Sequence, residues 1–341
     1  MLNTVYRLTE PRKIEVEFQN IELESGKVVV RPTHLSICNA DQRYYQGKRS
    51  AEILSKKLPM ALIHEGIGRV IHSDNDEFQA GDMVIMIPNT PNETDEIIHE
   101  NYLRSSKFRA SGFDGFMQDI VVMPPDRLVK IPSDINPEVA AFSEIISVGY
   151  HSISRFLEFS HKRRNLIGIW GDGNMAFLIT LLLRYRLPKS KLVVFGKNKY
   201  KLEYFSFADE THLITDIPSD FAPDHAFECV GGDGSEPAIN QIIDYINPEG
   251  TISILGVSEN NVPINTRMVL EKGLRIYGSS RSGREDFLNT AKMFKEYPEI
   301  VDYFTNIISE VIEVNDISDM KMAFEKDIRK SYGKTIMLWN V

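Results

Sequence analysis

Hydrophobic and polar positions alternate differently in two stretches of the chain. Residues 1 to about 147 contain short apolar runs broken by turn signals, among them KVVVRP, GIGRVIHS, GDMVIMIP, MQDIVVMP and RLVKIP. Many short strands with frequent turns indicate a mainly β domain with a barrel-like core. From about residue 160, apolar strands alternate with helical segments: the strand NLIGIWG, the helix NMAFLITLLLRYRL, the strand KLVVFG and the helix NKYKLEYFSF come first. This alternation predicts βαβ units around a parallel sheet.

The alternation ends near residue 280 with the strand LRIYGSS, and the tail adds two helical segments, REDFLNTAKMFKEYP and ISDMKMAFEKD, and a strand, KTIMLWNV. The predicted fold class is therefore α/β, with a Rossmann dinucleotide-binding domain beside a mainly β catalytic domain. We expect the catalytic domain at 1–147, the dinucleotide-binding domain at 148–282, and a C-terminal segment, 283–341, that returns largely to the catalytic domain.

Composition narrows the classes of partner. The chain has 341 residues and a formal net charge of −9, and it shows no basic stripe of the kind that nucleic-acid binders carry. No apolar run reaches the roughly 18 residues of a membrane span, and the N-terminus lacks the apolar core of a secretory signal. Two cysteines cannot build a disulfide framework. These features predict a cytoplasmic protein that binds neither nucleic acid nor membrane.

A glycine-rich turn lies between a predicted strand and a predicted helix, in GIWGDGNMA. Gly171, Gly173 and Ala176 occupy the three positions of a G-x-G-x-x-G/A fingerprint, with Asn174 and Met175 between them. The first glycine allows a tight turn, the second lets the backbone approach a pyrophosphate, and the third position packs the helix on the strand. The pattern alone is weak, but its βαβ setting predicts a dinucleotide site.

The next strand predicts which dinucleotide binds. An acidic residue normally ends this strand and binds the ribose 2′-hydroxyl. Here the strand ends at Gly196, followed by three lysines: Lys197, Lys199 and Lys201. A lysine forms a charge-assisted hydrogen bond to a 2′-phosphate, whereas a carboxylate would repel it. Because cations are disfavoured at a helix N-terminus, an anionic partner explains the lysines better than solvation does. We therefore predict NADP(H), with Lys197 as the main 2′-phosphate ligand.

The β-rich part of the chain holds residues of the types that bind Zn²⁺. Cys38, His64, Glu65 and Glu144 offer a thiolate, an imidazole and carboxylates, which suit a four-coordinate zinc ion. Each has an ordinary alternative, such as a buried cysteine, a hydrogen-bonded core histidine or a solvated glutamate. Spacing does not prove that these residues converge.

The motif order resembles the medium-chain dehydrogenase/reductase superfamily along nearly the whole chain. The matching features are a Cys after the third strand, an HE-x-x-G-x-V segment, a GD-x-V turn, a Glu before the linking helix, the nucleotide fingerprint and the closing GKTIMLW strand. More narrowly, LSICNADQRYYQGKR, LPMALIHEG, IPNTP, FRASGFDGFMQD, HAFECVGG and LEKGLRIYGSSRSG resemble the ribulose-5-phosphate reductases, also called ribitol-5-phosphate dehydrogenases.

This resemblance implies a GroES-like catalytic domain and one catalytic zinc ion bound by Cys38, His64 and Glu144, with Glu65 as a further carboxylate that binds the metal or exchanges with water. It implies NADPH-dependent reduction of a phosphorylated ketose, D-ribulose 5-phosphate, to D-ribitol 5-phosphate. The product is the precursor of CDP-ribitol for teichoic acid or capsule, and a cytidylyltransferase is the implied partner. Relatives of this kind are commonly homodimers or homotetramers.

The sequence departs from the superfamily pattern in two places. The four-cysteine lobe that binds a structural zinc in many relatives is absent, and the segment 88–113 stands in its place without cysteine. Relatives often carry Ser or Thr two residues after the first zinc-binding Cys, as part of a proton relay, whereas this chain has Ala40. Asp41 or a water held by Glu65 then becomes the relay candidate.

A phosphorylated substrate needs its own cation. Arg43, Lys48 and Arg49 follow Cys38 in one polar segment, and arginine suits a bidentate grip on phosphate whereas lysine acts as a point charge. A solvated loop explains any one of them equally well, and Arg104, Lys107 and Arg281 are further candidates.

Other functions are compatible with parts of the pattern. A zinc polyol dehydrogenase for an unphosphorylated sugar alcohol shares the metal and the fold but needs no phosphate site. A non-catalytic NADP-binding sensor would not need Cys38, His64, Glu65 and Glu144, and the same residues disfavour a zinc-independent quinone reductase. Bound zinc together with ketose-dependent NADPH oxidation separates an enzyme from a sensor, and a comparison of ribulose 5-phosphate, xylulose 5-phosphate and fructose identifies the substrate class.

Overall fold

The computed structural model describes residues 1–132 and 134–341. The chain divides into two compact units. The first unit joins Met1–Ser147 with Ser282–Val341, and the second unit is Val148–Arg281. Helix α4 (Ser143–Phe159) begins in the first unit and continues into the second. Each unit is described below by itself.

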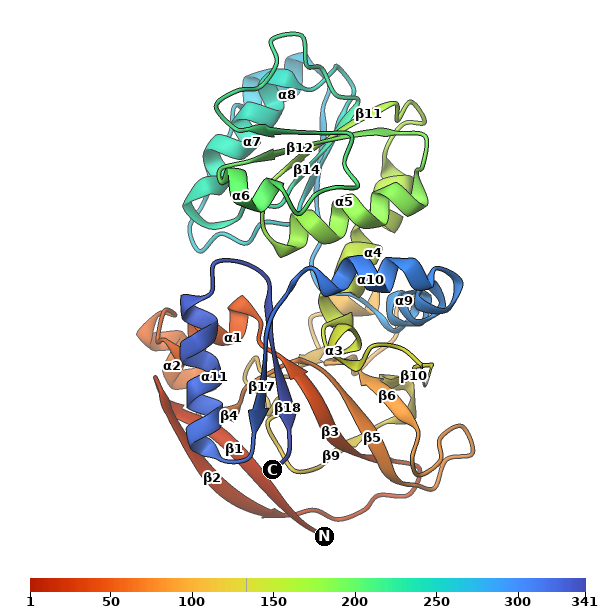
Figure 1. The fold of residues 1–341 in the computed structure, drawn as a ribbon, viewed down its shortest axis with the longest axis vertical. Coiled ribbons are helices and arrows are strands. Elements are labelled where there is room, and N and C mark those ends of the chain that lie inside the picture. Colours follow the sequence, from red (N-terminus) through yellow and green to blue (C-terminus); the bar gives the residue numbers. More distant parts are fainter. Residues whose placement is uncertain (133) are drawn as a thin grey trace. The chain divides into compact units, whose positions relative to one another are not determined.

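The first unit is built on β-sheets, as its short apolar runs predict (Figure 1). Its largest sheet has the order β10-β6-β5-β3-β18-β17, with β9 paired to β3, and a second sheet has the order β2-β1-β4. A small pair, β7-β8, lies in the segment that replaces the four-cysteine lobe. The strands are β1 (Leu2–Glu10), β2 (Lys13–Asn20), β3 (Val28–Ser36), β4 (Met60–Ala61), β5 (Glu65–Ser73), β6 (Met83–Met86), β7 (Asn89–Thr90), β8 (Lys107–Phe108), β9 (Val121–Met123), β10 (Leu128–Lys130), β17 (Ile308–Val314) and β18 (Lys334–Trp339).

Short helices pack around these sheets. Alternate strand residues of β1, β3 and β18 enter one apolar core that also receives the buried face of α11, where Phe324 stacks on Tyr45 with ring centres 4.5 Å apart. The C-terminal strand β18 lies between β3 and β17, so the last residues of the chain complete the main sheet. The helices of this unit, besides the start of α4, are α1 (Asn39–Tyr45), α2 (Ala51–Lys57), α3 (Pro137–Ala140), α9 (Arg284–Glu296), α10 (Pro298–Thr305) and α11 (Ile317–Arg329).

The second unit contains one parallel sheet of order β13-β12-β11-β14-β15-β16. The order reverses between β11 and β14, and right-handed crossovers then place α5 on one face of the sheet and α7 with α8 on the other (Figure 1). The elements are β11 (Leu166–Trp170), α5 (Asn174–Arg186), β12 (Lys191–Gly196), α6 (Lys199–Leu202), β13 (Glu210–Leu213), β14 (His225–Glu228), α7 (Ser235–Tyr245), β15 (Thr251–Ile254), α8 (Thr266–Glu271) and β16 (Arg275–Gly278).

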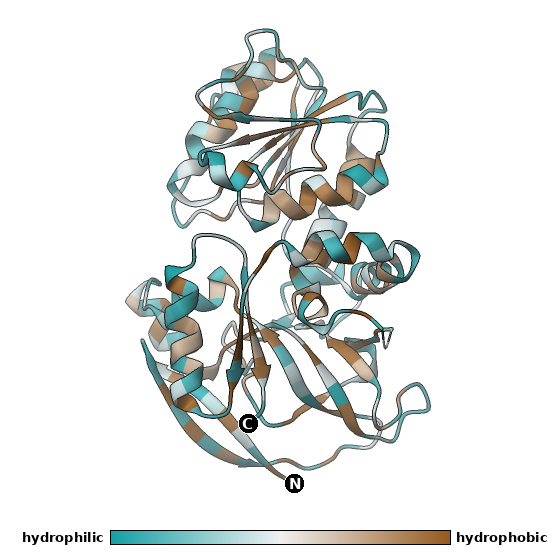
Figure 2. Cartoon of the chain, in the orientation of Figure 1, coloured by the Kyte–Doolittle hydropathy of each residue, from teal (hydrophilic) through white to brown (hydrophobic). Residues whose placement is uncertain are grey.

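Hydropathy follows this layering. Figure 2 shows much of α5 and the central strands in brown, because eight consecutive residues of α5, from Ala176 to Leu183, are buried. A helix that is apolar nearly all round belongs in a core rather than on a surface. Within the part of the chain that the structure describes, no helix is both long enough and apolar enough to cross a membrane.

The fold class predicted from the sequence is confirmed, and one element is shorter than expected. The segment NKYKLEYFSF predicted a helix, but α6 is a single turn, Lys199–Leu202. Turns follow it because Phe205 and Phe207 fold back onto Phe177 of α5, with ring centres 5.7 and 4.9 Å from that ring. The argument from a helix dipole near the lysines therefore fails, since one turn has little macrodipole.

Candidate active site

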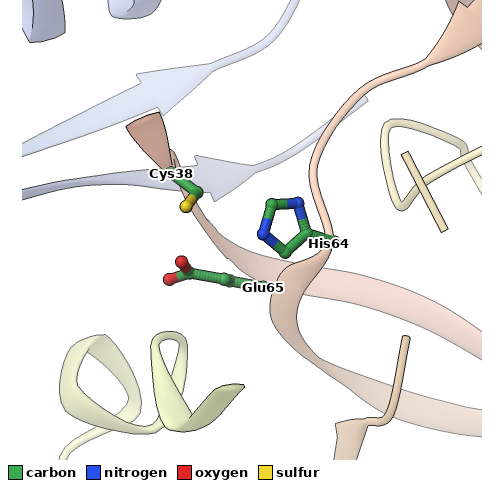
Figure 3. Close-up of side chains that lie close together, drawn as sticks. All are labelled: Cys38, His64 and Glu65. Atoms are coloured by element: carbon green, nitrogen blue, oxygen red, sulfur yellow. The ribbon is translucent and has the colours of Figure 1, made fainter. Parts of the chain in front are cut away.

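Three side chains of the first unit come together at the ends of two neighbouring strands. Cys38 follows β3 and caps α1, His64 directly precedes β5, and Glu65 is the first residue of β5. One potential ligand atom from each residue lies within 4.8 Å of the others (Figure 3). The antiparallel pairing of β3 with β5, in which Ser36 stands opposite Glu65, brings these separate sequence segments together.

The ring of His64 is held by a carboxylate behind it. Nδ1 of His64 lies 3.3 Å from Oδ1 of Asp41, which also accepts the backbone N–H of Ile63 at 3.0 Å. The other oxygen of Asp41 accepts the backbone N–H of Cys38 at 3.2 Å. A carboxylate on one ring nitrogen fixes the orientation of a histidine and leaves its other nitrogen for a metal. Asp41 thus positions Cys38 and His64 together.

This placement favours an orienting role for Asp41 over the relay role considered from the sequence. Its side chain is fully buried, and both oxygens accept the hydrogen bonds that shape the backbone of Cys38 and Ile63. A relay group must lie within hydrogen-bond reach of the proton that it transfers, whereas the oxygens of Asp41 face these backbone groups and the His64 ring. The position fits a group that orients ligands instead.

The backbone that carries His64 is strained. Ile63 has φ = 71°, a left-handed conformation that is a genuine outlier for a β-branched residue. Its carbonyl accepts the N–H of Phe116 at 2.7 Å, and a Cβ on Gly115 would lie only 2.3 Å from the same carbonyl oxygen. Glycine at 115 therefore permits the close backbone approach that holds this conformation. Strain of this kind persists where the surroundings over-determine it, often at functional sites.

A buried lysine that sequence analysis missed pairs with Glu65. Nζ of Lys334, the first residue of β18, lies 2.8 Å from Oε1 and 2.7 Å from Oε2 of Glu65. Ser36 donates its hydroxyl to Oε2 at 2.9 Å. The pair joins positions 269 residues apart because β18 and β5 both flank β3. Lysine is almost never fully buried unless it is paired, so this pair belongs to the site rather than to solvent.

Glu144 lies in the first turn of α4 and is buried beside the same charges. Burial is the main cause that raises the pKa of Glu144; His64 and Lys334 oppose the shift and the charge of Glu65 assists it, and the resulting pKa is about 7. Its interaction with these residues places it next to the cluster, although its oxygens are not among the ligand atoms that lie within 4.8 Å of one another.

The charges of the site shift two further groups. Burial lowers the pKa of His64, but the negative charges of Asp41 and Cys38 more than offset this, and the pKa ends well above its ordinary value. Burial also lowers the pKa of Lys334, but the negative charges of Glu65 and Cys38 outweigh this effect, so the pKa lies above its ordinary value. The site therefore concentrates negative charge around its nitrogen donors and attracts a cation.

The donor set fits zinc. A thiolate, an imidazole nitrogen and carboxylate oxygens are the ligands that Zn²⁺ takes in catalytic sites, which keep one position open. Cys38, His64 and Glu65 supply one of each type, with Glu144 adjacent. The carboxylate on His64 Nδ1 supplies the outer contact that such ligands usually have.

The segment 88–113 that replaces the cysteine lobe is held by charge and hydrogen bonds. Arg127, buried beneath it, donates to Oε1 of Glu100 at 2.8 Å and to the carbonyl of Asn89 at 3.3 Å. Arg109 donates to the carbonyl of Asp114 at 3.1 Å, and burial lowers the pKa of Arg109 to about 10. Two arginines thus connect this segment to the sheet.

The glycine-rich turn of the second unit has the geometry that a pyrophosphate needs. Gly171 has φ = 134°, and a Cβ there would come within 3.0 Å of the carbonyl oxygen of Cys229. A Cβ on Gly173 would meet nothing within 4 Å, so open space faces this backbone. Gly173 is also the N-cap of α5, and as a glycine it has no side chain that could cap the first N–H groups of the helix. Backbone N–H groups at such a helix end bind phosphate.

Beyond this turn, Asp172 organises the lysine segment. Its Oδ2 accepts the backbone N–H groups of Lys197 and Asn198 at 2.8 and 2.7 Å. Lys197 and Lys199 are exposed, and Lys201 is half-buried. Gly196 has no room for a side chain, because a Cβ would lie 2.7 Å from Leu202 and 2.8 Å from Asp172.

The three cations considered for the substrate phosphate differ in their surroundings. Arg43 is half-buried in the last turn of α1, and Lys48 is exposed just beyond it. Arg49 lies over the ring of Tyr44, with its Cζ 5.1 Å from the ring centre.

Comparison with known proteins decides the family. The family models for the alcohol dehydrogenase GroES-like domain and for the zinc-binding dehydrogenase match residues 24–133 and 200–296. The chain is 54% identical to the ribulose-5-phosphate reductase of Bacillus spizizenii, with 100% of both chains covered. The chain belongs to the ribulose-5-phosphate reductase family. The resemblance found in the sequence motifs is thereby confirmed.

Other members of the family agree. Ribulose-5-phosphate reductase 1 of Staphylococcus aureus is 50% identical, over 99% of both chains. The crystal structure of S. aureus TarJ in complex with NADPH superimposes with a TM-score of 0.90 at 46% identity, over 99% of both chains. Galactitol-1-phosphate dehydrogenase of Escherichia coli, at 16% identity and a TM-score of 0.81, shares the fold.

Proposed function

We propose that the protein reduces D-ribulose 5-phosphate to D-ribitol 5-phosphate with NADPH and one catalytic zinc ion. The observation that carries this proposal is the 54% identity to a ribulose-5-phosphate reductase along the full length of both chains. The cluster of Cys38, His64 and Glu65 supports it independently, because a zinc ion held there would polarise a substrate carbonyl.

Cys38, His64 and Glu144 are the residues we propose to hold the zinc ion. Bound zinc supplies a Lewis acid that polarises the C2 carbonyl of the ketose. Asp41 keeps the His64 ring and the Cys38 backbone in place, and Lys334 with Ser36 fixes the carboxylate of Glu65. Cys38, His64 and Glu65 are thus positioned before the substrate arrives, which is the main protein contribution to such a reaction.

The second unit binds the nucleotide in this proposal. The N-terminus of α5 and the open backbone at Gly173 bind the pyrophosphate, and Lys197 binds the 2′-phosphate. Lys199 and Lys201 add positive charge nearby. NADPH supplies the hydride, and the NADPH complex of S. aureus TarJ supports this choice of cofactor.

The product hydroxyl also needs a proton. With Ala40 in place of a hydroxyl side chain and Asp41 committed to its N–H donors, we assign the proton path to a water held by Glu65. Glu65 suits this task because Lys334 and Ser36 fix its position beside Cys38 and His64, while its Oε1, which accepts from Lys334, retains a further lone pair.

We place the reaction in the cytoplasm, in a homodimer or homotetramer. A reaction that produces ribitol 5-phosphate supplies a cytidylyltransferase that makes CDP-ribitol for teichoic acid or capsule. The names of the relatives that are 45–54% identical support the substrate in this scheme.

One assay tests the function. NADPH oxidation by zinc-loaded protein is measured with D-ribulose 5-phosphate, D-xylulose 5-phosphate and D-fructose, and the products are identified. We expect turnover with D-ribulose 5-phosphate and formation of D-ribitol 5-phosphate. A preference for fructose would instead assign a polyol dehydrogenase, and NADPH binding without turnover of any ketose would assign a sensor.

A further inference from the structure

A pair of cations surrounds one tyrosine of the first unit. The ring of Tyr44, near the end of α1, is buried, and the Arg49 guanidinium and the Lys57 ammonium lie 5.1 and 5.9 Å from its centre. Nζ of Lys57 also donates to the hydroxyl of Ser111 at 2.8 Å. We name Tyr44, Arg49, Lys57 and Ser111 the Tyr44 cluster.

Two segments connect the Tyr44 cluster to the zinc-ligand residues. Helix α1 begins at Cys38, and six residues of helix place Tyr44 about 9 Å along the axis. The turn after β8 makes the second connection: the Phe108 ring lies 5.5 Å from that of His64, and the N–H of Ser111 bonds to the carbonyl of Phe108 at 3.2 Å. The Tyr44 cluster therefore lies on the order of 10 Å from Cys38, His64 and Glu65.

Lys57 differs from the lysine beside it. Lys56 is exposed on α2 and forms an ion pair with Glu52, Nζ to Oε1 at 2.6 Å. The two contacts of Lys57, with a hydroxyl and an aromatic ring, are uncharged. The Lys57 charge is thus balanced by neither contact, while Arg49 adds a second positive charge on the same ring. The Lys57 ammonium beside a hydroxyl group attracts a small anion, and the Arg49 guanidinium adds to the local positive potential.

We propose that the Tyr44 cluster is the subsite for the phosphate monoester of the substrate, with Lys57 as its main ligand. The inference rests on the proposed function, in which the C2 carbonyl lies at the metal. The phosphate on C5, at the other end of the sugar, then reaches the cluster. Lys57 and Arg49 supply the charge and Ser111 a hydroxyl, which together match a phosphate dianion. Of these three residues, only Arg49 was a phosphate-binding candidate from the sequence; the structure adds Lys57 and Ser111.

Lys57→Met tests this subsite, with Lys56→Met as the matched control. Loss of a charge-assisted hydrogen bond predicts a ten- to hundredfold rise in KM for D-ribulose 5-phosphate, with kcat/KM for unphosphorylated D-ribulose unchanged. Inorganic phosphate competes with D-ribulose 5-phosphate in the native protein, and we expect this inhibition to weaken to the same extent. Lys57→Arg retains the charge and should restore most of the affinity.

Several outcomes overturn the proposal. An equal rise in KM for both substrates would show a general loss of packing around Tyr44, and an equal effect of Lys56→Met would show a long-range charge effect. Unchanged circular dichroism and zinc content establish that the variants are folded. If the native protein prefers D-ribulose 5-phosphate and Lys57→Met keeps that preference, only the subsite is wrong. If the native protein shows no preference for the phosphate ester, the proposed function itself is wrong.

Discussion

The metal cluster of the first unit and the nucleotide turn of the second unit are built in opposite ways. The nucleotide turn is contiguous, since Gly171 to Ala176 lie on one strand-turn-helix connection. The residues of the candidate zinc site lie in or next to β3, β5, β18 and α4, so they meet only in the folded unit. The nucleotide lysines are largely exposed, whereas the charges around the metal cluster are buried. Substitutions in the first site should therefore disturb metal and folding, and substitutions in the second should change affinity alone.

The largest effect is expected at Cys38. Cys38→Ser removes the thiolate, and we expect zinc to be lost and kcat to fall by at least about 10²–10³-fold, as it does when stabilisation of developing negative charge is removed. Metal analysis and ketose-dependent NADPH oxidation measure both. Cys229→Ser, at the other cysteine of the chain, is the control and should keep both properties. Full activity of zinc-free Cys38→Ser would contradict the metal assignment.

Lys334→Met tests whether buried charge in the first unit is structural. It leaves the buried carboxylate of Glu65 without its cation, which costs about 3–5 kcal/mol. Urea unfolding of the zinc-free protein measures the loss. The double variant Lys334→Met/Glu65→Gln removes the uncompensated charge and should recover part of the stability. If the two variants are equally unstable, packing rather than charge explains the effect.

His225 tests how a buried ionisable group affects the stability of the second unit. Its Nε2 bonds to the carbonyl of His161 at 3.2 Å, and its Nδ1 accepts the N–H of Thr251 at 3.2 Å, so the neutral ring is fully bonded. Burial, followed by the positive charge of His161, lowers the pKa of His225 to about 4.

Since the folded state resists protonation, His225 should cost stability as pH falls from about 6.5 to about 4, by about 3 kcal/mol in total. Hydrogen exchange of the β14 amides reports this unit separately. His225→Gln should flatten the pH dependence, whereas His212→Gln, at a less buried histidine, should not. The same slope in His225→Gln and the native protein would contradict the assignment.

The smallest effect is expected at Lys197. Lys197→Ala should raise KM for NADPH about tenfold or more through loss of a charge-assisted hydrogen bond, and leave KM for NADH unchanged. Lys199→Ala serves as the control and should have a weaker effect. A parallel change for both cofactors would remove Lys197 from the 2′-phosphate site. Gly196→Asp would also be expected to change the cofactor preference, but it is an unsuitable test because a side chain there would collide with Leu202 and Asp172.

The contrast between the contiguous nucleotide turn and the dispersed metal site also explains how much could be predicted from the sequence. Periodicity and the glycine fingerprint predicted the parallel sheet and its nucleotide turn, because both are local patterns. The residue types of the zinc site were recognised, but their convergence was supported by resemblance rather than by spacing. Lys334 was missed, since a lysine at the start of a strand is usually exposed, and its partner lies 269 positions away. The orienting contacts of Asp41 could not be predicted, because its bonds to Cys38 and Ile63 depend on tertiary structure.

The position of Lys334 close to the C-terminus has a consequence for biosynthesis. The second unit lies wholly within Val148–Arg281 and can fold while translation continues, but the first unit needs its last strand. Until Lys334 leaves the ribosome, Glu65 has no cation beside it, and β3 lacks its neighbour β18. The residues proposed to hold zinc therefore reach their final setting only once β18 has joined β3, so a nascent chain that lacks β18 would carry an incomplete metal site.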